Sequence, residues 1–202
     1  MKKKDLEIIL QTLPIPQNTT PHLEQYITPA SIAADIIFFA YLNNDIYNKH
    51  VVDLGSGTGI FAIAAAFTQA KKITAIEIDH DLIKIAETFT QNHHLVIEFI
   101  QNDIQNISLQ ADVILTNPPF GAQKPNQHAD RLFIEKAYEI APITYSLHLS
   151  HTIPFISKLI HALNGTITHQ KNYKFPIKHQ FSFHTKPIKY FDVTMIRSKR
   201  IK

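Results

Sequence analysis

The sequence predicts an α/β fold in which a mostly parallel, seven-stranded sheet has helices on both faces and ends in an antiparallel hairpin. Two observations support this prediction. Strand-like runs that are apolar almost throughout alternate with helical segments, and such runs are typical of parallel strands buried on both faces. The last two strand-like runs have no helix between them, which indicates an antiparallel pair. Because no linker-like stretch divides the chain, we expect one domain over residues 1–202.

The first part of the chain, residues 1–45, is expected to hold two helices. An amphipathic helix is predicted over residues 1–12 and a second over Pro29–Leu42, where Thr28 is placed to cap the first turn and proline suits the first helical position. Later helices are predicted over residues 59–70, Asp81–Asn92, Ala129–Ile140 and Thr152–Leu163. The predicted strands are, in order, HVVDL, KKITAIEI, LVIEFI, ADVILT, ITYSLHL, GTITHQKNYKF and IKYFDVTMIR.

The basic residues are concentrated toward the C-terminal end. Ten of the 20 Lys and Arg residues fall within residues 158–202, which contain a single acid, Asp192. This basic hairpin region could contact a phosphate backbone. A solvated, lysine-rich surface explains the same composition equally well.

Composition also limits the kinds of site that are possible. The chain has no cysteine, so disulfides and thiolate metal sites are excluded. None of the 12 histidines has the spacing of a metal-ligand pair, and we expect no metal. No apolar run is long enough for a membrane span or a signal peptide. These features suit a cytoplasmic protein that does not associate with a membrane.

A glycine turn follows the first predicted strand, in the segment DLGSGTG (Asp53–Gly59). Gly55, Gly57 and Gly59 allow tight turning and let a ligand approach the backbone closely. In a doubly wound sheet this turn lies at the carboxyl ends of the strands, where ligands bind. A dinucleotide fingerprint would need a small residue where Ile60 stands. The spacing therefore favours S-adenosylmethionine, which has no pyrophosphate to place on the helix end.

Acidic side chains follow the next two predicted strands. Glu77 ends the second strand about twenty residues beyond the glycine turn, where an acid can bind ribose hydroxyls. Asp103 follows the third strand and could accept a hydrogen bond from an adenine amino group, with Ile104 as an apolar wall. Helix capping by these acids is the alternative explanation, and their position after two successive strands favours the ligand site.

The fourth predicted strand leads into Asn117, Pro118, Pro119 and Phe120. Prolines hold this loop rigid and leave its carbonyls free to accept hydrogen bonds, and a residue before proline is biased toward an extended form. We expect the side-chain oxygen of Asn117 and the carbonyl of Pro118 to accept the two hydrogens of one planar amino group, while Phe120 stacks on the ring that bears it. Such an arrangement suits methyl transfer to an exocyclic amine or an amide nitrogen, although Asn-Pro-Pro alone can also be a stiff turn.

Four further residues are candidates for contact with a substrate. Tyr145 and His148 end the fifth predicted strand, near the same pocket, and Phe183 and His184 lie in the basic hairpin region. The sequence leaves two alternatives open for them. His148 could be a satisfied structural histidine, and residues 183–184 could belong to a solvated hairpin loop.

Taken together, DLGSGTG and NPPFG resemble the amino-group branch of the class I S-adenosylmethionine-dependent methyltransferases, which have a Rossmann-like fold. More narrowly, the chain resembles the methyltransferase-like protein 5 family, archaeal and eukaryotic enzymes that form N6-methyladenosine in small-subunit ribosomal RNA. The matching stretches lie between Leu23 and Arg197 and include LEQYITP, NKHVVDLGSGTG, EIDHD, QNDI, NPPFG, YSLHLSHT and FSFH. One departure is the segment FPIKHQFSFH, which is one residue longer than its counterpart in the family.

The resemblance implies a role for each matched residue. The cofactor contacts that it carries over are Gln25, Thr28, Gly55, Thr58, Ile60, Glu77, Asp103 and Ile104, with Glu77 in a ribose-binding role that the family fills with aspartate. It also implies that NPPFG is the catalytic loop and that the substrate is structured RNA. Finally, it implies a small zinc-ribbon activator protein that pairs along the sheet edge near residues 95–100.

Two other functions stay open on sequence alone. Protein glutamine-N5 methyltransferases use a similar Asn-Pro-Pro loop, because an amide nitrogen poses the same chemical problem, but they usually close the motif with tyrosine where Phe120 stands. A catalytically silent RNA-binding scaffold is the other alternative. It is opposed by four intact residues, Gly55, Glu77, Asp103 and Asn117.

Overall fold

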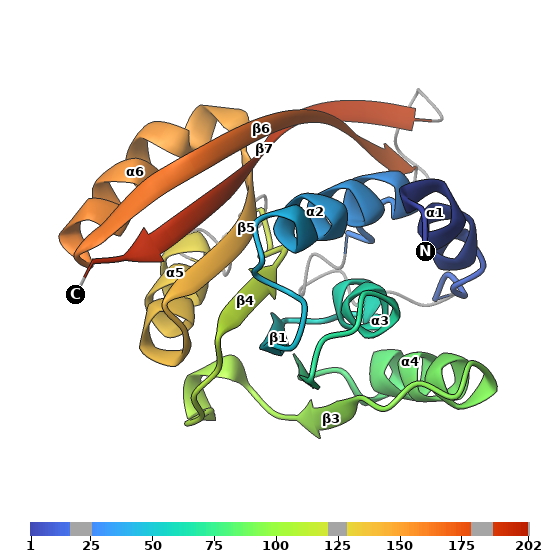
Figure 1. Ribbon diagram of the computed structural model, residues 1–202. Helices are drawn as coiled ribbons and strands as arrows, with labels where there is room; N and C mark the ends of the chain where they lie inside the picture. Colours follow the sequence, from blue (N-terminus) through green and yellow to red (C-terminus); the bar gives the residue numbers. More distant parts are fainter. Residues whose placement is uncertain (17–25, 121–128, 179–187, 202) are drawn as a thin grey trace.

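Seven strands form one mixed sheet in the computed structural model, which describes residues 1–16, 26–120, 129–178 and 188–201. The strands are β1 (His50–Leu54), β2 (Lys72–Glu77), β3 (Glu98–Gln101), β4 (Val113–Thr116), β5 (Ile143–Leu149), β6 (Gly165–Lys178) and β7 (Ile188–Arg200). Their spatial order is β3-β2-β1-β4-β5-β7-β6 (Figure 1). β1 to β5 run parallel, whereas β7 pairs antiparallel with both β5 and β6. The predicted fold class is therefore confirmed.

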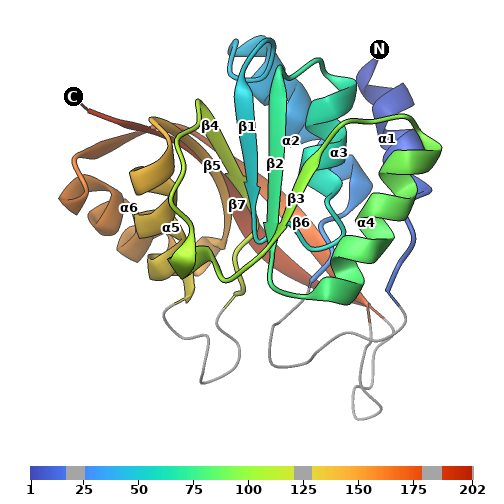
Figure 2. The same cartoon turned by 90° about the horizontal axis from the view of Figure 1, so that it is seen from below.

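Six α-helices cover the sheet within the described ranges. They are α1 (Lys3–Gln11), α2 (Ala30–Leu42), α3 (Ile60–Phe67), α4 (His80–Asn92), α5 (Ala129–Ile140) and α6 (Ile153–Ala162). α1 to α4 lie on one face of the sheet, and α5 and α6 lie on the other (Figure 2). None of the helices in these ranges combines the length and the apolar character that crossing a membrane requires.

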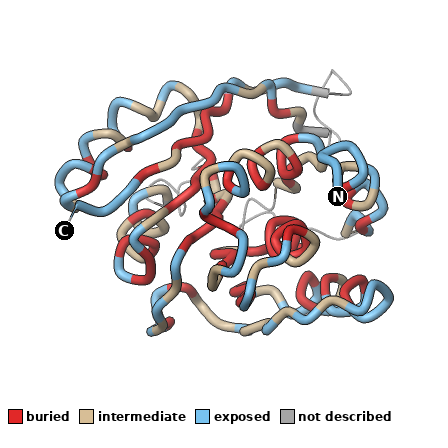
Figure 3. The backbone as a smooth tube through the Cα atoms, in the orientation of Figure 1, coloured by how far each residue is buried: buried red, intermediate tan, exposed pale blue. Residues whose placement is uncertain are grey.

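The largest core lies between the sheet and the helices α1 to α3, where buried residues concentrate (Figure 3). The β6–β7 hairpin curves over α2, so that Phe175 of β6 and Met195 of β7 are buried in this same core. β1 and β4 are buried almost throughout, as expected for central parallel strands. β2 and β3 lie on one side of β1 in the sheet, and β4 and β5 lie on the other side. The strand order therefore reverses between β1 and β4.

The N-terminus of α2 differs from expectation. α2 begins at Ala30, after Pro29, and no side chain caps it. The predicted capping by Thr28 is wrong, because the Thr28 hydroxyl accepts a hydrogen bond from Asn117 Nδ2 at 3.0 Å. Thr28 therefore joins the segment before α2 to the loop after β4.

The edge strand is shorter than predicted. β3 covers only Glu98–Gln101, and residues 95–97 of the expected strand precede it. Val96, in this preceding stretch, is 90% exposed. β3 nevertheless lies at one edge of the sheet, as predicted for this segment.

Candidate functional site

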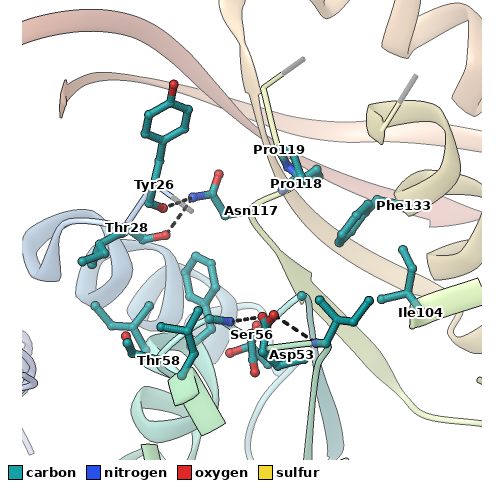
Figure 4. A pocket seen from close by; sticks show the side chains of 18 of the residues that line it. Tyr26, Thr28, Asp53, Ser56, Thr58, Ile104, Asn117, Pro118, Pro119 and Phe133 are labelled. Atoms are coloured by element: carbon teal, nitrogen blue, oxygen red, sulfur yellow. Dashed lines mark hydrogen bonds between the residues drawn. The ribbon is translucent and has the colours of Figure 1, made fainter. Parts of the chain in front are cut away.

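A cavity of about 450 Å³ opens where the parallel strands end, beside the point at which the strand order reverses (Figure 4). It is lined by the segment before α2, the glycine loop after β1, the ends of β2 and β3, the loop after β4, and one side of α5. The lining includes Tyr26, Thr28, Asp53, Gly55, Ser56, Gly57, Thr58, Ile60, Glu77, Asp103, Ile104, Asn117, Pro118, Pro119 and Phe133. Most of the residues predicted to form the site are thus brought together, and Gly59 lies just outside the lining.

The glycine loop presents its backbone to the cavity. Gly55 and Gly57 have φ angles of 69° and 56°, in the left-handed region that glycine adopts without strain. A Cβ on Gly55 would lie 2.7 Å from Cε1 of Phe133, whereas a Cβ on Gly57 would meet no described heavy atom within 4 Å. The backbone at Gly57 is therefore open to a ligand, and a side chain there would fill part of the space.

Two buried carboxylates accept hydrogen bonds from the backbone of the glycine loop and of α3, the helix that follows it. Asp53 is 1% exposed, and its Oδ2 accepts a hydrogen bond at 2.9 Å from the N–H of Ala62, in the first turn of α3. Glu77 Oε2 accepts from the N–H of Gly57 at 2.7 Å, and its Oε1 accepts from the two N–H groups that follow it, at 3.0 and 3.1 Å. An ionised carboxylate has about four acceptor positions, so Glu77 can hold the loop and still accept from a ligand hydroxyl.

Burial raises the pKa of both carboxyl groups. For Asp53 burial is the largest cause and raises the pKa well above its usual range; the nearby charge of Glu77 adds to the effect, and the N–H of Ala62 partly offsets it. For Glu77 burial again raises the pKa, while its backbone N–H donors favour the ionised form. The floor of the site therefore contains two acids whose charged forms are disfavoured by desolvation.

Asp103 and Ile104 both line the cavity beyond the end of β3. Asp103 Oδ1 accepts a hydrogen bond from the N–H of Gln105 at 2.9 Å and so caps the short 3-10 helix Ile104–Asn106. The capping that the sequence left open as an alternative is therefore present. It engages one of the two carboxylate oxygens and leaves the acid at the wall of the cavity.

The amide of Asn117 is held in one orientation. Its Nδ2 donates to Thr28 Oγ1 at 3.0 Å and to the carbonyl oxygen of Tyr26 at 3.4 Å. Its Oδ1 is buried and has no hydrogen-bond partner among the described residues. Leaving a buried acceptor unpaired costs about 1–3 kcal/mol. A ligand group that donates a hydrogen bond to Oδ1 therefore binds favourably here.

Ser56 supplies a second unpaired polar atom in the same cavity, because its Oγ is buried without a partner among the described residues. Apolar walls are provided by Ile60 and Ile104. Together with the open glycine backbone and the carboxylates, this set of groups suits a nucleoside, which has hydroxyl and amino groups around an apolar ring. The residues present therefore fit the predicted cofactor, S-adenosylmethionine.

Phe120 does not occupy the position expected for it. Its side chain is 7% exposed, and it lies in the core outside the cavity lining. Its ring stacks on Tyr26 at a centroid distance of 5.7 Å and meets Phe175 edge-on at 5.6 Å. The ring turns inward after Pro119 because burying a side chain of this size stabilises a fold by about 1.5–3 kcal/mol.

Tyr145 and His148 also lie away from the cavity lining. The Tyr145 hydroxyl donates to Asp45 Oδ2 at 2.5 Å, and Asp45 in turn accepts from Arg197. His148 is fully buried, with Nδ1 2.9 Å from Asp130 Oδ1 and Nε2 2.8 Å from a serine hydroxyl on the same strand. An odd spacing along β5 directs these two side chains to opposite faces of the sheet, and each finds its partners in a core.

Some predicted residues lie outside the described part of the chain, namely Gln25, Phe183 and His184. The cavity is also lined by residues that were not predicted from the sequence, among them Tyr26, Ser56 and Phe133. Tyr26 and Ser56 could have been predicted, since each is next to a predicted contact in the sequence. Phe133 could not, because nothing in the sequence around it shows that α5 reaches the glycine loop. Within the described ranges, no three His, Asp or Glu side chains gather as a metal ion would require.

Comparisons with known proteins agree with this geometry. The chain matches the methyltransferase small domain family over residues 33–145. It is 37% identical to an uncharacterized protein of Methanocaldococcus jannaschii, covering 100% of this chain and 95% of that protein. It is 31% identical to the rRNA N(6)-adenosine-methyltransferase METTL5 of Danio rerio, with 98% of each chain covered. A solved structure from Pyrococcus horikoshii, of a proposed RNA methyltransferase, matches with a TM-score of 0.92 at 32% identity, over 100% of this chain and 99% of that chain.

Proposed function

Because the chain belongs to the methyltransferase small domain family and to the METTL5-like family, we propose that it transfers a methyl group from S-adenosylmethionine to the N6 amino group of adenine in RNA. The proposed substrate is structured RNA, specifically ribosomal RNA, which the Danio rerio relative's name indicates for that protein. The small-subunit RNA is the one that the family resemblance implies. The single observation that carries the proposal is the position of Asn117 Oδ1, a buried and unpaired acceptor at the cavity.

An acceptor in this position answers the main chemical difficulty of the reaction. An exocyclic amino nitrogen is a poor nucleophile, because its lone pair is delocalised into the ring. Acceptors that hold its two hydrogens polarise the nitrogen and orient it. Asn117 Oδ1 is one such acceptor, and the carbonyl of Pro118, which also lines the cavity, is proposed as the second. Because Thr28 and Tyr26 hold Asn117 Nδ2, the amide presents its oxygen to the cavity.

The cavity also provides the groups that would hold the cofactor. The backbone at Gly57 and the hydroxyl of Ser56 face the ligand, Glu77 is proposed to accept from the ribose hydroxyls, and Asp103 and Ile104 to contact the adenine. When bound, S-adenosylmethionine would supply a methyl group attached to a sulfonium. The lone pair of the adenine nitrogen would form a bond to this methyl carbon as the bond between the carbon and the sulfur breaks. The nitrogen becomes strongly acidic as it is methylated, so its proton passes to water without a dedicated base.

The basic hairpin is proposed to contact RNA phosphates. Part of its charge is already paired within the protein, since Lys171 contacts Asp35 and Lys174 contacts Asp192. Lys189 and Lys199 are exposed and form no ion pair with a described residue. These two side chains are therefore available to a phosphate backbone.

Methyl transfer from tritiated S-adenosylmethionine tests the proposal directly. A small-subunit ribosomal RNA transcript and total cell protein are offered in parallel, and labelled RNA is digested to nucleosides. We expect N6-methyladenosine with the wild-type chain and a rate about 10²- to 10³-fold lower with Asn117→Ala, the loss typical of removing one preorganised hydrogen-bonding group. Label confined to protein would favour glutamine-N5 methylation. A wild-type chain that neither binds S-adenosylmethionine nor turns over would favour a scaffold.

We also propose that the free edge of β3 pairs with a small zinc-ribbon activator protein. β3 has a neighbouring strand on one side only among the described residues, and an edge strand offers unpaired N–H and C=O groups to a partner. Val96, just before β3, adds an exposed apolar side chain. Co-purification with a zinc-ribbon protein should weaken in Val96→Asp and persist in Ile8→Asp, a matched change at an exposed position of α1. Equal binding by both variants would contradict this proposal.

A further inference from the structure

The aromatic surface expected from Phe120 is not available to a base. Both rings that contact Phe120 belong to the protein, with Tyr26 stacked on it at an interplanar angle of 21° and Phe175 at 84°. With 7% of its side chain exposed and no place in the cavity lining, Phe120 can receive a base only if this packing is broken. Close-packed interiors resist such rearrangement.

Tyr26 lines the cavity, whereas Phe120 does not. Tyr26 is half-buried, and its ring stacks on that of Phe120. The Tyr26 ring and the Asn117 amide oxygen project to the same side of the pocket, away from Asp53 (Figure 4). The carbonyl of Tyr26 accepts from Asn117 Nδ2, so the backbone of one residue orients the other.

We propose that the Tyr26 ring, supported from behind by Phe120, is the surface on which the target adenine stacks while Asn117 Oδ1 accepts a hydrogen from its amino group. This inference rests on the proposed function and names the residue that receives the base. A flat ring beside a fixed acceptor places both the plane of the base and the edge that carries the amino group.

The arrangement also explains why Phe120 is aromatic although it does not reach the cavity. Ring pairs with centroids 4.5–7 Å apart attract each other beyond simple burial, as Tyr26 and Phe120 do at 5.7 Å. Phe120 therefore fixes the angle of Tyr26, and a base placed on Tyr26 would continue the stack. Phe120 acts as a positioning residue and Tyr26 as the contact residue.

Two roles of Tyr26 can be separated by substitution, because its carbonyl is backbone and its ring is side chain. Tyr26→Leu removes the ring and keeps the carbonyl that holds Asn117; Tyr26→Phe keeps the ring. Tyr47→Leu is the matched control, since Tyr47 is exposed and precedes β1 at the opposite end of the strands. Each variant is assayed for kcat and KM with the small-subunit ribosomal RNA transcript and for its Kd for S-adenosylmethionine by calorimetry.

Loss of one base-stacking ring should lower kcat/KM for RNA by about 5- to 150-fold in Tyr26→Leu. Tyr47→Leu should remain close to wild type, Tyr26→Phe should keep a kcat/KM clearly above that of Tyr26→Leu, and the Kd for S-adenosylmethionine should be unchanged in all three. Once the methylated position is mapped, an RNA with 2-aminopurine there should show a fluorescence change with wild type and Tyr26→Phe that is lost with Tyr26→Leu.

Two results would overturn the inference. Tyr26→Leu could retain the kcat/KM of wild type, or it could weaken binding of S-adenosylmethionine as much as it lowers kcat/KM, which would make Tyr26 part of the cofactor wall. Failure of the proposed function is distinguishable from both. In that case the wild-type chain itself would form no N6-methyladenosine, before any variant is compared.

Discussion

Asp53 contributes to folding in two opposing ways, as an acceptor and as a buried charge, and two substitutions separate them. Asp53→Ala leaves the Ala62 N–H, in the first turn of α3, without its acceptor. A buried donor left unpaired costs about 1–3 kcal/mol, so the free energy of unfolding should fall by about this amount. Asp53→Asn keeps an oxygen that can accept the same bond and removes the charge that burial disfavours. Its free energy of unfolding should therefore stay within about 1 kcal/mol of wild type at neutral pH.

The same substitution has a pH signature whose sign follows from the raised pKa. The folded protein holds the Asp53 proton to higher pH than the unfolded chain does. The contribution of Asp53 to stability is thus fully present below the unfolded pKa, about 3.9, and is lost as the pH rises through the folded pKa. The pKa of Glu77 is also raised, but Glu77 is present in both proteins. The difference between wild type and Asp53→Asn therefore reports the titration of Asp53 together with its electrostatic coupling to Glu77.

Urea unfolding followed by circular dichroism, repeated between about pH 4 and pH 8, measures this difference. Wild type should lose stability relative to Asp53→Asn as the pH rises. Parallel curves for the two proteins would show that the carboxyl group titrates normally. If Asp53→Asn were as unstable as Asp53→Ala, the acceptor oxygen of residue 53 would not be what stabilises the first turn of α3.

Three further predictions follow from the same contacts. Asn117→Ala should change the free energy of unfolding by less than about 1 kcal/mol, as urea unfolding can measure, because the loss of the two Nδ2 bonds is offset by removal of the unpaired Oδ1. Tyr145→Phe removes the donor to Asp45 and should destabilise the fold by about 1.5–3 kcal/mol; its KM for RNA should not change, and an altered KM would place Tyr145 at the substrate. RNA affinity, measured by fluorescence anisotropy, should fall steeply between about 50 and 200 mM salt if the hairpin contacts phosphates. The slope of log affinity against log salt concentration should be roughly proportional to the number of these contacts. A flat response would remove the hairpin from the RNA interface.

The central strands could be predicted from the sequence because a strand buried on both faces consists of consecutive apolar residues. β1 and β4 are buried almost throughout and appear where the apolar runs predict them. The edge was harder, because an apolar run does not show where pairing starts. β3 begins at Glu98, opposite Thr74, whose hydroxyl donates to the Glu98 carboxylate at 3.1 Å. This polar contact joins the two strands where β3 begins, and the local composition of residues 95–101 does not indicate it.

The site shows the same division between local and long-range causes. Three parts of the site were predicted from the sequence: the glycine turn, the acids at the ends of β2 and β3, and the Asn-Pro-Pro corner. Each depends on backbone freedom or on position at a strand end, and each contributes to the cavity lining, although Gly59 of the turn does not. The direction of the Phe120 ring was not predicted. It is decided by Tyr26, from the segment before α2, and by Phe175, from the hairpin. The same holds for Tyr145 and His148, whose carboxylate partners, Asp45 and Asp130, lie outside β5.

These long-range contacts have a consequence for how the two halves of the cavity are joined. Thr28, assigned by resemblance to the cofactor, is also the side chain that fixes the amide of Asn117, at the proposed methyl acceptor. The carbonyl of Tyr26 holds the same amide, and its ring packs on Phe120. A short segment before α2 therefore orients groups on both sides of the point where methyl donor and acceptor would meet. Preorganisation of this kind lowers the barrier to reaction only when both sides are fixed relative to each other, and in this fold the segment at residues 26–28 supplies that connection.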